Sequence, residues 1–349
     1  MKNISITTEL TIRQAMKALD STAEKCLLVT DGDMKLLGTL TDGDIRRAIL
    51  AGKGFSESIE NCYNSSPTVL NGGTYTKDEA INLLRDQKLD LIPIVDTNNH
   101  VQNFITWSRL GQNGDNTKES LSDIPVVIMA GGKGTRMEPF TTVLPKPLIP
   151  IHDKPIIEHI INRFVDLECN EFYLTVNYKG RILKAFFEEL DPEYNVSFLD
   201  ETEPLGTAGA LKFLKGKFSQ SFFVTNCDTI IKADFLKLHQ FHEKENNDIT
   251  LVASAKEFTI PYGTCELNDE GHLSHITEKP TFDFLVNTGL YVLKPEVLRL
   301  IPDNQFYHMT HLIKNAKDQG LKIGVFPIDE DAWIDIGQWA EYKKAVGQL

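Results

Sequence analysis

The sequence predicts an α/β protein: a larger C-terminal part built on a mostly parallel sheet, preceded by a smaller α+β module. Two observations support this. From Ile124 onward, short apolar runs alternate with amphipathic stretches, as happens when helices join parallel strands. Ahead of that region, one stretch of sequence occurs twice. The length of 349 residues also fits about two domains better than one.

The repeated stretch is expected to form a helix followed by two strands. The sequence from Thr11 aligns with that from Thr76, an offset of 65 residues, and the same offset aligns LLVTD with IPIVD and GTLT with NFIT. Apolar residues at helical spacing come first in each copy, then a short strand, a turn (31–33 or 98–99) and a second strand. A unit this small buries little surface, so we expect the copies to pack together as a pseudo-symmetric pair.

The first copy ends in GTLTDGDIR, and with the repeat it resembles a tandem cystathionine β-synthase (CBS) domain pair, a regulatory module that often binds adenosine nucleotides. The resemblance covers residues 1–110, with repeats at about 1–55 and 60–110. It implies that Thr41 and Asp44 hold the ribose of an adenine nucleotide. The second copy ends in TWSR, with Arg109 where the family has aspartate. The alternative is a pair that only packs and dimerises.

Residues 111–121 are expected to form a linker, because GQNGDNTKES contains no large apolar side chain. The C-terminal domain is then 122–349. Its predicted strands are 124–130, 172–177, 221–226, 249–254 and 322–326, and its predicted helices include 155–168 and 233–246. A sheet of this kind binds ligands at the carboxyl ends of its strands.

A glycine-rich loop, GGKGTR, follows the first of these strands, and LPKPL follows the loop. Glycines let backbone amides approach an anion, and a nearby arginine and lysine neutralise a polyphosphate. The spacing fits neither a Walker loop nor a dinucleotide fingerprint, and a simple tight turn is the alternative. The residues of this predicted triphosphate site are Gly131, Gly132, Gly134, Thr135, Arg136 and Lys146.

The longer segment GGKGTRMEPFTTVLPKPLIPI resembles the signature of the sugar-1-phosphate nucleotidylyltransferases, with Met137 and Phe140 as its local departures. Further family motifs follow in order: PLGTAG, NCD, YG, EKP, NTG and WIDIG. The resemblance spans residues 124–349 and implies a Rossmann-like domain. It also implies that the loop containing Gly206 and Gly209 faces the nucleobase.

Asp228 and Asp335 are the candidate metal ligands. Asp228 follows a predicted strand, and Asp335 lies in a short apolar segment. Carboxylates are hard oxygen ligands suited to Mg²⁺, which takes its other ligands from water and substrate phosphates. The matching aspartates of the family hold the metal, whereas either aspartate taken alone could be a turn or helix-cap residue.

The EKP and NTG motifs imply the sugar-phosphate site. By resemblance, Lys279 grips the phosphate and Glu278 accepts hydrogen bonds from sugar hydroxyls; a solvated surface pair is the alternative. The residues expected to line the sugar pocket are Gly263, Asn287 and Thr288. His239, His242, His308 and His311 occur in pairs three apart but lack a third ligand nearby, so we interpret them as surface or packing residues.

The resemblance implies transfer of a nucleotidyl group from a nucleoside triphosphate to a sugar 1-phosphate, with Mg²⁺, giving an NDP-sugar and pyrophosphate. The module order is similar to that of bacterial guanylyltransferases that make GDP-glucosamine for legionaminic-acid biosynthesis, which favours GTP and glucosamine 1-phosphate. Mannose 1-phosphate with GTP is the nearest alternative, followed by UTP, CTP or dTTP enzymes. A rival of another class is a non-catalytic sensor of nucleotide sugars.

Composition excludes several other classes. The net charge of −13 opposes binding to nucleic acid or to an anionic membrane surface. The five scattered cysteines suggest neither a disulfide framework nor a zinc site, and no apolar run approaches the roughly 18 residues of a membrane span. We therefore expect a cytoplasmic protein. We also expect homo-oligomers, formed through the CBS or the catalytic domains.

Overall fold

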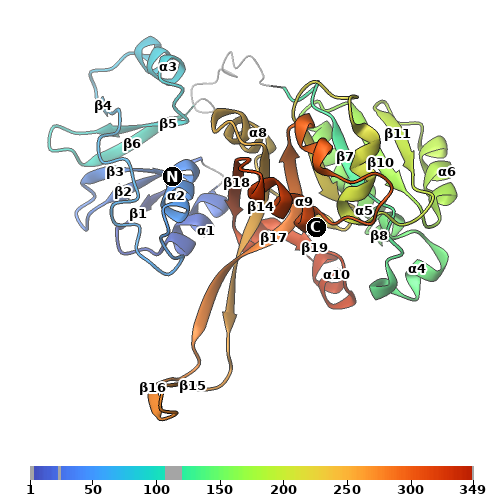
Figure 1. The fold of residues 1–349 in the computed structure, drawn as a ribbon. Coiled ribbons are helices and arrows are strands. Elements are labelled where there is room, and N and C mark those ends of the chain that lie inside the picture. Colours follow the sequence, from blue (N-terminus) through green and yellow to red (C-terminus); the bar gives the residue numbers. More distant parts are fainter. Residues whose placement is uncertain (1–3, 23–24, 107–119, 348–349) are drawn as a thin grey trace. The chain divides into compact units, whose positions relative to one another are not determined.

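The computed structural model describes residues 4–22, 25–106 and 120–347, and the chain divides into two compact units (Figure 1). The first unit contains residues 1–118 and 255–284, and the second contains 119–254 and 285–349. This division differs from the predicted boundaries, because residues 255–284 group with the N-terminal module. Most of the predicted linker and Arg109 lie outside the described residues.

Each repeat of the first unit forms a three-stranded sheet, in the orders β1-β2-β3 and β4-β5-β6. Helices α1 and α3 begin directly after Thr11 and Thr76, as the repeat predicts, and these two hydroxyls accept hydrogen bonds from the amides of Gln14 and Glu79, both at 3.2 Å. Helix α2, which the N-cap residue Thr41 precedes, was not predicted. The elements are β1 (Ser5–Ile6), α1 (Ile12–Thr22), β2 (Cys26–Thr30), β3 (Leu36–Thr41), α2 (Asp42–Leu50), β4 (Leu70–Asn71), α3 (Lys77–Asp86), β5 (Leu91–Val95) and β6 (Val101–Thr106).

The two repeats meet through their matching turns. In each turn one aspartate, Asp31 or Asp96, accepts hydrogen bonds from two backbone amides at 2.8 to 3.0 Å. The amide of Leu36 donates to the carbonyl of Asn99 at 2.8 Å, and the Asn99 side chain donates back to the Leu36 carbonyl at 2.9 Å. Asp31 and Asp96, which are equivalent in the two copies, therefore stabilise equivalent turns. The two turn regions are also hydrogen-bonded to each other through Leu36 and Asn99.

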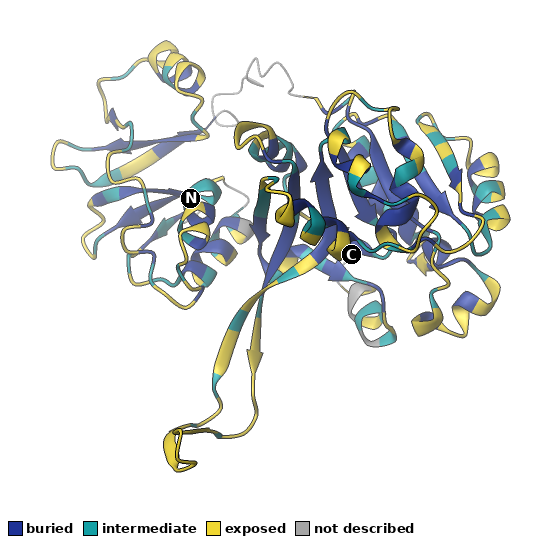
Figure 2. Cartoon of the chain, in the orientation of Figure 1, coloured by how far each residue is buried: buried dark blue, intermediate teal, exposed yellow. Residues whose placement is uncertain are grey.

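The first unit also contains a long hairpin, residues 255–284, which we call the arm. It consists of the distal parts of β14 (Ile249–Thr259) and β17 (Thr281–Leu293) together with β15 (Thr264–Leu267) and β16 (Leu273–Thr277). Much of its surface is exposed (Figure 2). Its exposed large apolar side chains are Phe258, Ile260, Tyr262, Leu267, Leu273, Ile276, Phe282 and Phe284.

The second unit is built on a seven-stranded sheet in the order β11-β10-β7-β12-β17-β14-β18. Strands β11, β10, β7 and β12 run parallel, β17 is antiparallel to β12, and β14 is parallel to β18. The predicted parallel-rich α/β fold is confirmed. Besides β14 and β17, the strands of the sheet are β7 (Val126–Met129), β10 (Glu171–Val176), β11 (Asn195–Asp200), β12 (Phe222–Asn226) and β18 (Ile323–Ile328).

The central strand β7 is buried on both faces, because its residues alternate between two apolar clusters. Val126 and Ile128 belong to one apolar cluster, together with residues of α5 and α8, whereas Val127 and Met129 belong to another, together with residues of α9. The helices are α4 (Phe140–Val143), α5 (Ile156–Val165), α6 (Gly180–Leu190), α7 (Gly206–Gly209), α8 (Phe235–Lys244), α9 (Met309–Asp318) and α10 (Trp339–Ala345).

Two short antiparallel pairs complete the second unit. They are β8 (Pro150–Ile151) with β9 (Lys154–Pro155), and β13 (Thr229–Ile231) with β19 (Trp333–Asp335). The second pair matters for the site, because its ends carry the two predicted metal ligands. Within the described residues, no helix has the length and apolar character needed to cross a membrane.

Candidate nucleotide and metal site

The glycine-rich loop leaves the carboxyl end of β7 and folds closely onto the chain that follows it. Gly134 has φ of 66°, and a Cβ there would lie 2.9 Å from Cγ2 of Thr141 and 3.1 Å from Cβ of Lys146. The hydroxyl of Thr141 donates to the Gly134 carbonyl at 3.0 Å. Only glycine combines this backbone conformation with this close approach. The contact brings the loop, with its exposed Thr135 and Arg136, beside Lys146.

Lys146 is buried, and its ammonium group donates a hydrogen bond to Oδ2 of Asp228. Asp228 stands between the end of β12 at Asn226 and the start of β13 at Thr229, which is the carboxyl-end position that its sequence context predicted. The sequence placed Lys146 on the triphosphate. In the structure, the Lys146 ammonium group is instead paired with the Asp228 carboxylate, next to the glycine-rich loop.

Asp335, although it is 107 residues after Asp228 in the sequence, lies close to Asp228 in the fold. Strand β19 pairs with β13 so that Asp335 lies opposite Thr229. Oδ1 of Asp335 accepts a hydrogen bond from the Gly337 amide at 2.7 Å. A Cβ on Gly337 would lie 2.9 Å from Oδ1 of Asp335 and 3.4 Å from Oδ2 of Asp228. Both carboxylates therefore border the space in front of the Gly337 Cα, which a side chain would fill.

Charges around this space act on each other. Burial raises the pKa of Asp335 above its ordinary value, and the negative charge of Asp228 raises it further. The Gly337 amide, Lys146 and Arg136 oppose that rise. Arg136, Lys146, Asp228 and Asp335 thus form one interacting group, although they come from three separated parts of the sequence.

The two aspartates fit the predicted Mg²⁺ by their chemistry. Both are hard oxygen donors, and Mg²⁺ in phosphate-transfer sites needs only one or two carboxylates, since water and substrate supply the rest. No group of three or more histidine, cysteine, aspartate or glutamate side chains suited to a metal occurs in the described part of the chain. Two carboxylates alone would leave most of the coordination sphere of Mg²⁺ to water and substrate phosphate.

The PLGTAG loop forms the short helix α7 and packs against the segment before α9. Gly206 has φ of 79°, and a Cβ there would lie 2.7 Å from the Tyr307 carbonyl oxygen. The amides of Ala208 and Gly209 both donate to that carbonyl, at 2.9 and 3.1 Å. Here the two glycines allow close packing of the chain on itself, and these two amides are already hydrogen-bonded.

Glu201 is a buried residue of this region that the sequence analysis missed. Its Oε2 accepts a hydrogen bond from the Leu205 amide at 2.9 Å, and a Cβ on Gly131 would lie only 2.4 Å from its Oε1. Burial raises the pKa of this carboxyl. Glu201 therefore lies between the glycine-rich loop and the PLGTAG loop. A strand prediction for 195–200 would have placed it at a strand's carboxyl end.

The NTG motif is more buried than a sugar-lining segment was expected to be. Thr288 is 1% exposed, and its hydroxyl donates to the Val252 carbonyl at 2.9 Å, within the sheet. Asn287 donates to the Tyr291 hydroxyl at 2.7 Å. Gly289 has φ of 86°, and a Cβ there would lie 2.4 Å from Nδ2 of Asn226, a second residue that the sequence analysis missed.

The remaining predicted sugar-phosphate residues lie on the arm, in the first unit. A Cβ on Gly263 would lie 3.0 Å from Oε2 of Glu278, so these two are neighbours. Lys279 has φ of 46°, a left-handed conformation that non-glycine residues adopt at a cost. The structure thus brings Gly263, Glu278 and Lys279 together on one unit, and the glycine-rich loop, Lys146 and the two aspartates on the other.

The predicted adenine-nucleotide residues cap a helix. Thr41 and Asp44 form a capping box at the start of α2, in which Oδ2 of Asp44 accepts from the Thr41 hydroxyl at 2.6 Å and from its amide at 2.8 Å. The other carboxylate oxygen pairs with Arg47. These contacts explain both residues structurally, and nucleotide binding here stays a prediction.

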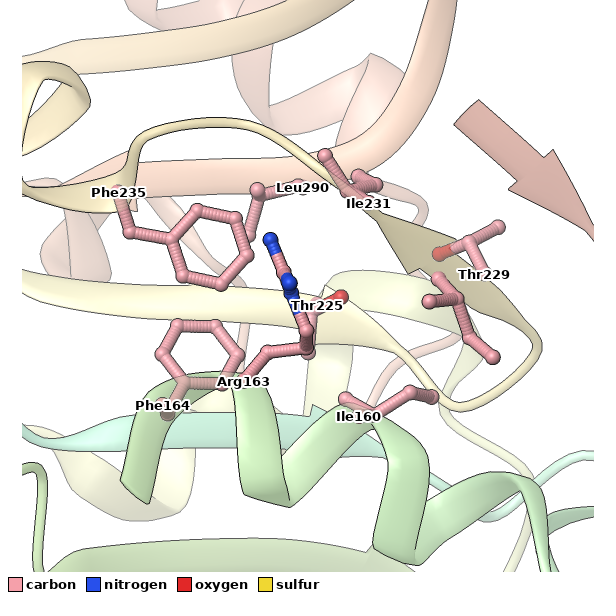
Figure 3. A pocket seen from close by; sticks show the side chains of 9 residues that line it. Ile160, Arg163, Phe164, Thr225, Thr229, Ile231, Phe235 and Leu290 are labelled. Carbon is pink, nitrogen blue, oxygen red and sulfur yellow. The ribbon is translucent and has the colours of Figure 1, made fainter. Parts of the chain in front are cut away.

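A small cavity lies under β13, between α5 and the central strands (Figure 3). Nε of Arg163 and Oγ1 of Thr229 line it and have no hydrogen-bond partner among the described residues. The volume that the centre of a water molecule can occupy in this cavity is about 10 Å³. The cavity is therefore large enough for one bound water but too small for a substrate. The other lining residues are Ile160, Phe164, Thr225, Ile230, Ile231, Phe235 and Leu290.

Comparison with known proteins agrees with this geometry. Residues 125–349 match the family model described as nucleotidyl transferase, and residues 1–51 match the CBS domain. The mannose-1-phosphate guanyltransferase of Yarrowia lipolytica is 34% identical over 224 residues, which are 61% of this chain and 60% of that protein. That of Saccharomyces cerevisiae is 32% identical over 233 residues, 61% of either chain. The chain thus spans about three fifths of the length of these curated relatives.

Among solved structures, HddC from Yersinia pseudotuberculosis is 26% identical with a TM-score of 0.51, covering 64% of this chain and 99% of that one. A structure of HddC complexed with GMP-PN, 24% identical with the same TM-score and coverage, shows likeness of fold alone. The family model covers 225 of the 349 residues. Because this match covers more than half of the chain, we conclude that the chain belongs to the nucleotidyl transferase family.

Proposed function

We propose that the protein transfers a nucleotidyl group from GTP to a hexose 1-phosphate, releasing pyrophosphate. The observation that carries this proposal is the group formed by Lys146, Asp228 and Asp335 around the gap at Gly337, beside the glycine-rich loop. Clustered cations and hard carboxylates next to a glycine loop suit phosphate chemistry.

In this reaction a phosphate oxygen of the sugar 1-phosphate attacks the α-phosphorus of GTP, and the bond to the β-phosphate bridging oxygen breaks. The protein contributes position and charge more than covalent chemistry. Exposed Arg136 would neutralise the triphosphate, and Lys279 would hold the attacking phosphate. Lys146 keeps the Asp228 carboxylate oriented. Mg²⁺, held by Asp228 and Asp335, would supply further charge neutralisation between the two phosphates.

Guanine is the base that a buried carboxylate suits best. Its Watson–Crick edge presents two adjacent donors, N1–H and the N2 amino group, and a carboxylate can accept from both. Glu201 lies between the two nucleotide loops, and curated relatives are named as guanyltransferases. These two lines support GTP.

For the sugar, the names of the curated relatives favour mannose 1-phosphate. Glucosamine 1-phosphate is the second candidate, because a CBS domain precedes the catalytic domain here, as the resemblance to the guanylyltransferases of legionaminic-acid biosynthesis implies. We place the reaction in the cytoplasm. None of the five cysteines, all of which lie in the described ranges, forms a disulfide, and this fits a reducing compartment.

Pyrophosphate release with Mg²⁺, measured for five nucleoside triphosphates against mannose, glucosamine, N-acetylglucosamine and glucose 1-phosphates, tests the proposal. Turnover confined to GTP with one hexose 1-phosphate supports it and selects the sugar. Turnover with a nucleoside triphosphate other than GTP would support nucleotidyl transfer but contradict the proposal that the base is guanine. Folded protein that turns over no pair would favour the non-catalytic sensor.

A further inference from the structure

Arg13 of the first repeat makes polar contacts with both strands of the arm. Arg13, near the start of α1, donates from Nη2 to Oδ1 of Asp283 on β17 and from Nη1 to the Ala255 carbonyl at 3.4 Å. Its Nε lies 3.8 Å from Oε2 of Glu257. Arg13 therefore contacts both strands of the arm where the arm begins.

Neighbouring groups strengthen this contact. The Ser56 hydroxyl donates to Oδ2 of Asp283 at 3.0 Å, so the module binds both carboxylate oxygens of that residue. The Arg13 guanidinium lies 5.4 Å from the centre of the Phe55 ring. Ala255 is 1% exposed and belongs to the apolar cluster of the first repeat. The arginine side chain is 16% exposed and the Asp283 side chain 19%, so water screens this ion pair less than a surface pair.

Asp283 and Lys279 are close in the same segment. The two residues predicted to bind the sugar phosphate, Glu278 and Lys279, come directly before β17, and Asp283 lies near its start. Beside them the Ile260 amide donates to the Pro280 carbonyl at 3.0 Å, which ties this segment to the opposite strand of the arm. Fixing Asp283 therefore limits the movement of the segment that carries Lys279.

We propose that Arg13 and Asp283 are positioning residues: they anchor the arm on the first repeat, and the N-terminal module thereby sets the affinity for the sugar 1-phosphate. The inference rests on the proposed function, because it assumes that Glu278 and Lys279 bind that substrate. Neither Arg13 nor Asp283 touches substrate. A ligand that changed the module would change sugar-phosphate affinity, and the sugar phosphate would change affinity for that ligand by the same factor.

Steady-state kinetics of the full chain carrying Arg13→Met, Asp283→Asn or both tests this. We expect the KM for the sugar 1-phosphate to rise by about threefold to thirtyfold, while the KM for GTP stays within about twofold. Because the two residues act through one contact, the double variant is expected to be no worse than the more damaging single variant. Arg13→Lys, which keeps a charge but not the fork of donors, should give an intermediate value.

Arg85→Met is the matched control, since Arg85 is an exposed arginine on α3 of the second repeat. It should leave both KM values unchanged. Hydrogen exchange supplies a readout that does not depend on turnover: amides of the arm, residues 255–284, should exchange faster in Arg13→Met than in Arg85→Met.

The outcomes separate the two proposals. If the wild type turns over no substrate pair, the proposed function is contradicted. If, in addition, the arm exchanges at the same rate in Arg13→Met as in Arg85→Met, the proposal that Arg13 anchors the arm is also contradicted. An active wild type contradicts this inference alone if the variants raise both KM values equally, if their effects are additive, or if arm exchange does not change.

Discussion

Lys146 and Asp228, which are 82 residues apart in the sequence, form a hydrogen-bonded ion pair that is largely shielded from water. The pair joins the segment after the glycine-rich loop to the turn after β12. Asp335 borders the same space in front of the Gly337 Cα. The lysine thus offsets part of the electrostatic repulsion between the Asp228 and Asp335 carboxylates.

Removing this ammonium group should impair catalysis strongly. In Lys146→Met the two carboxylates keep their places but lose the nearest positive charge, so we expect kcat to fall about a hundredfold or more. Initial rates at saturating substrates measure this. Lys184→Met is the control, because it breaks an exposed pair with Asp200 whose contribution should be small. Equal losses in the two variants would show that Lys146 has no special role.

Metal dependence should follow the two aspartates. Asp228→Asn and Asp335→Asn each remove one negative charge from the donor set while conserving shape, so each variant should need more Mg²⁺ for half-maximal activity. Titrating Mg²⁺ at fixed substrate concentrations measures this. Asp228→Asn should also retain most of the wild-type unfolding temperature. An unchanged Mg²⁺ requirement in both variants would assign the metal to other ligands.

The motifs predicted where the glycine-rich loop and Asp228 lie in the fold, because glycines and strand-end carboxylates act through local backbone geometry. Gly134 and Asp228 stand where their neighbours in sequence predicted them. Glu201 and Asn226 were missed, because their roles come from glycines far away, Gly131 and Gly289. No local pattern encodes such pairings.

The arm could not be predicted for a different physical reason. Of its two long strands, β14 was predicted only over 249–254 and β17 was not predicted. Residues 255–284 leave the apolar core, and their side chains are largely exposed (Figure 2). Ala255 and Asp283 contact the N-terminal module through Arg13, through Ser56 and through the apolar cluster of the first repeat. Contacts of this kind leave no periodic signal in the sequence.

Gly289 should tolerate no side chain. In Gly289→Ala the methyl group would meet the Asn226 amide at 2.4 Å, and the backbone has φ of 86°, so strain and a clash act together. We expect a loss of about 2 to 4 kcal/mol in unfolding free energy. Gly216→Ala isolates the backbone effect, because Gly216 has φ of 79° and open space around it; it should cost about 1 kcal/mol. Comparable losses in both would exclude the clash as a cause. Denaturant unfolding measures both.

Stability should fall in mild acid because of His242. This histidine is fully buried, its Nδ1 lies 2.8 Å from the Thr250 hydroxyl, and burial lowers its pKa from 6.5 to about 4. Between these values the unfolded chain binds a proton that the folded chain does not. The stabilisation is therefore complete above about pH 6.5 and is lost as the pH falls toward 4, by up to about 3 kcal/mol.

Unfolding by denaturant at pH 7 and pH 4.5 measures this loss. His242→Gln should be less stable at pH 7 but should lose less between the two pH values. His272→Gln, at an exposed histidine, should behave as the wild type does. A pH dependence that persists unchanged in His242→Gln would assign it to other groups.

Glu201 provides the sharpest test of base recognition. If its carboxylate accepts both N1–H and the N2 amino group of guanine, the wild type should prefer GTP to inosine triphosphate, which lacks that amino group, by about tenfold or more in kcat/KM. Glu201→Gln keeps an oxygen that can accept from the Leu205 amide but presents a donor where an acceptor is needed. The variant should therefore lose activity with GTP and, with it, most of the preference over inosine triphosphate. Glu203→Gln, an exposed neighbour, should keep that preference. Equal losses for both nucleotides in Glu201→Gln would instead mean that this carboxylate only holds the two loops together.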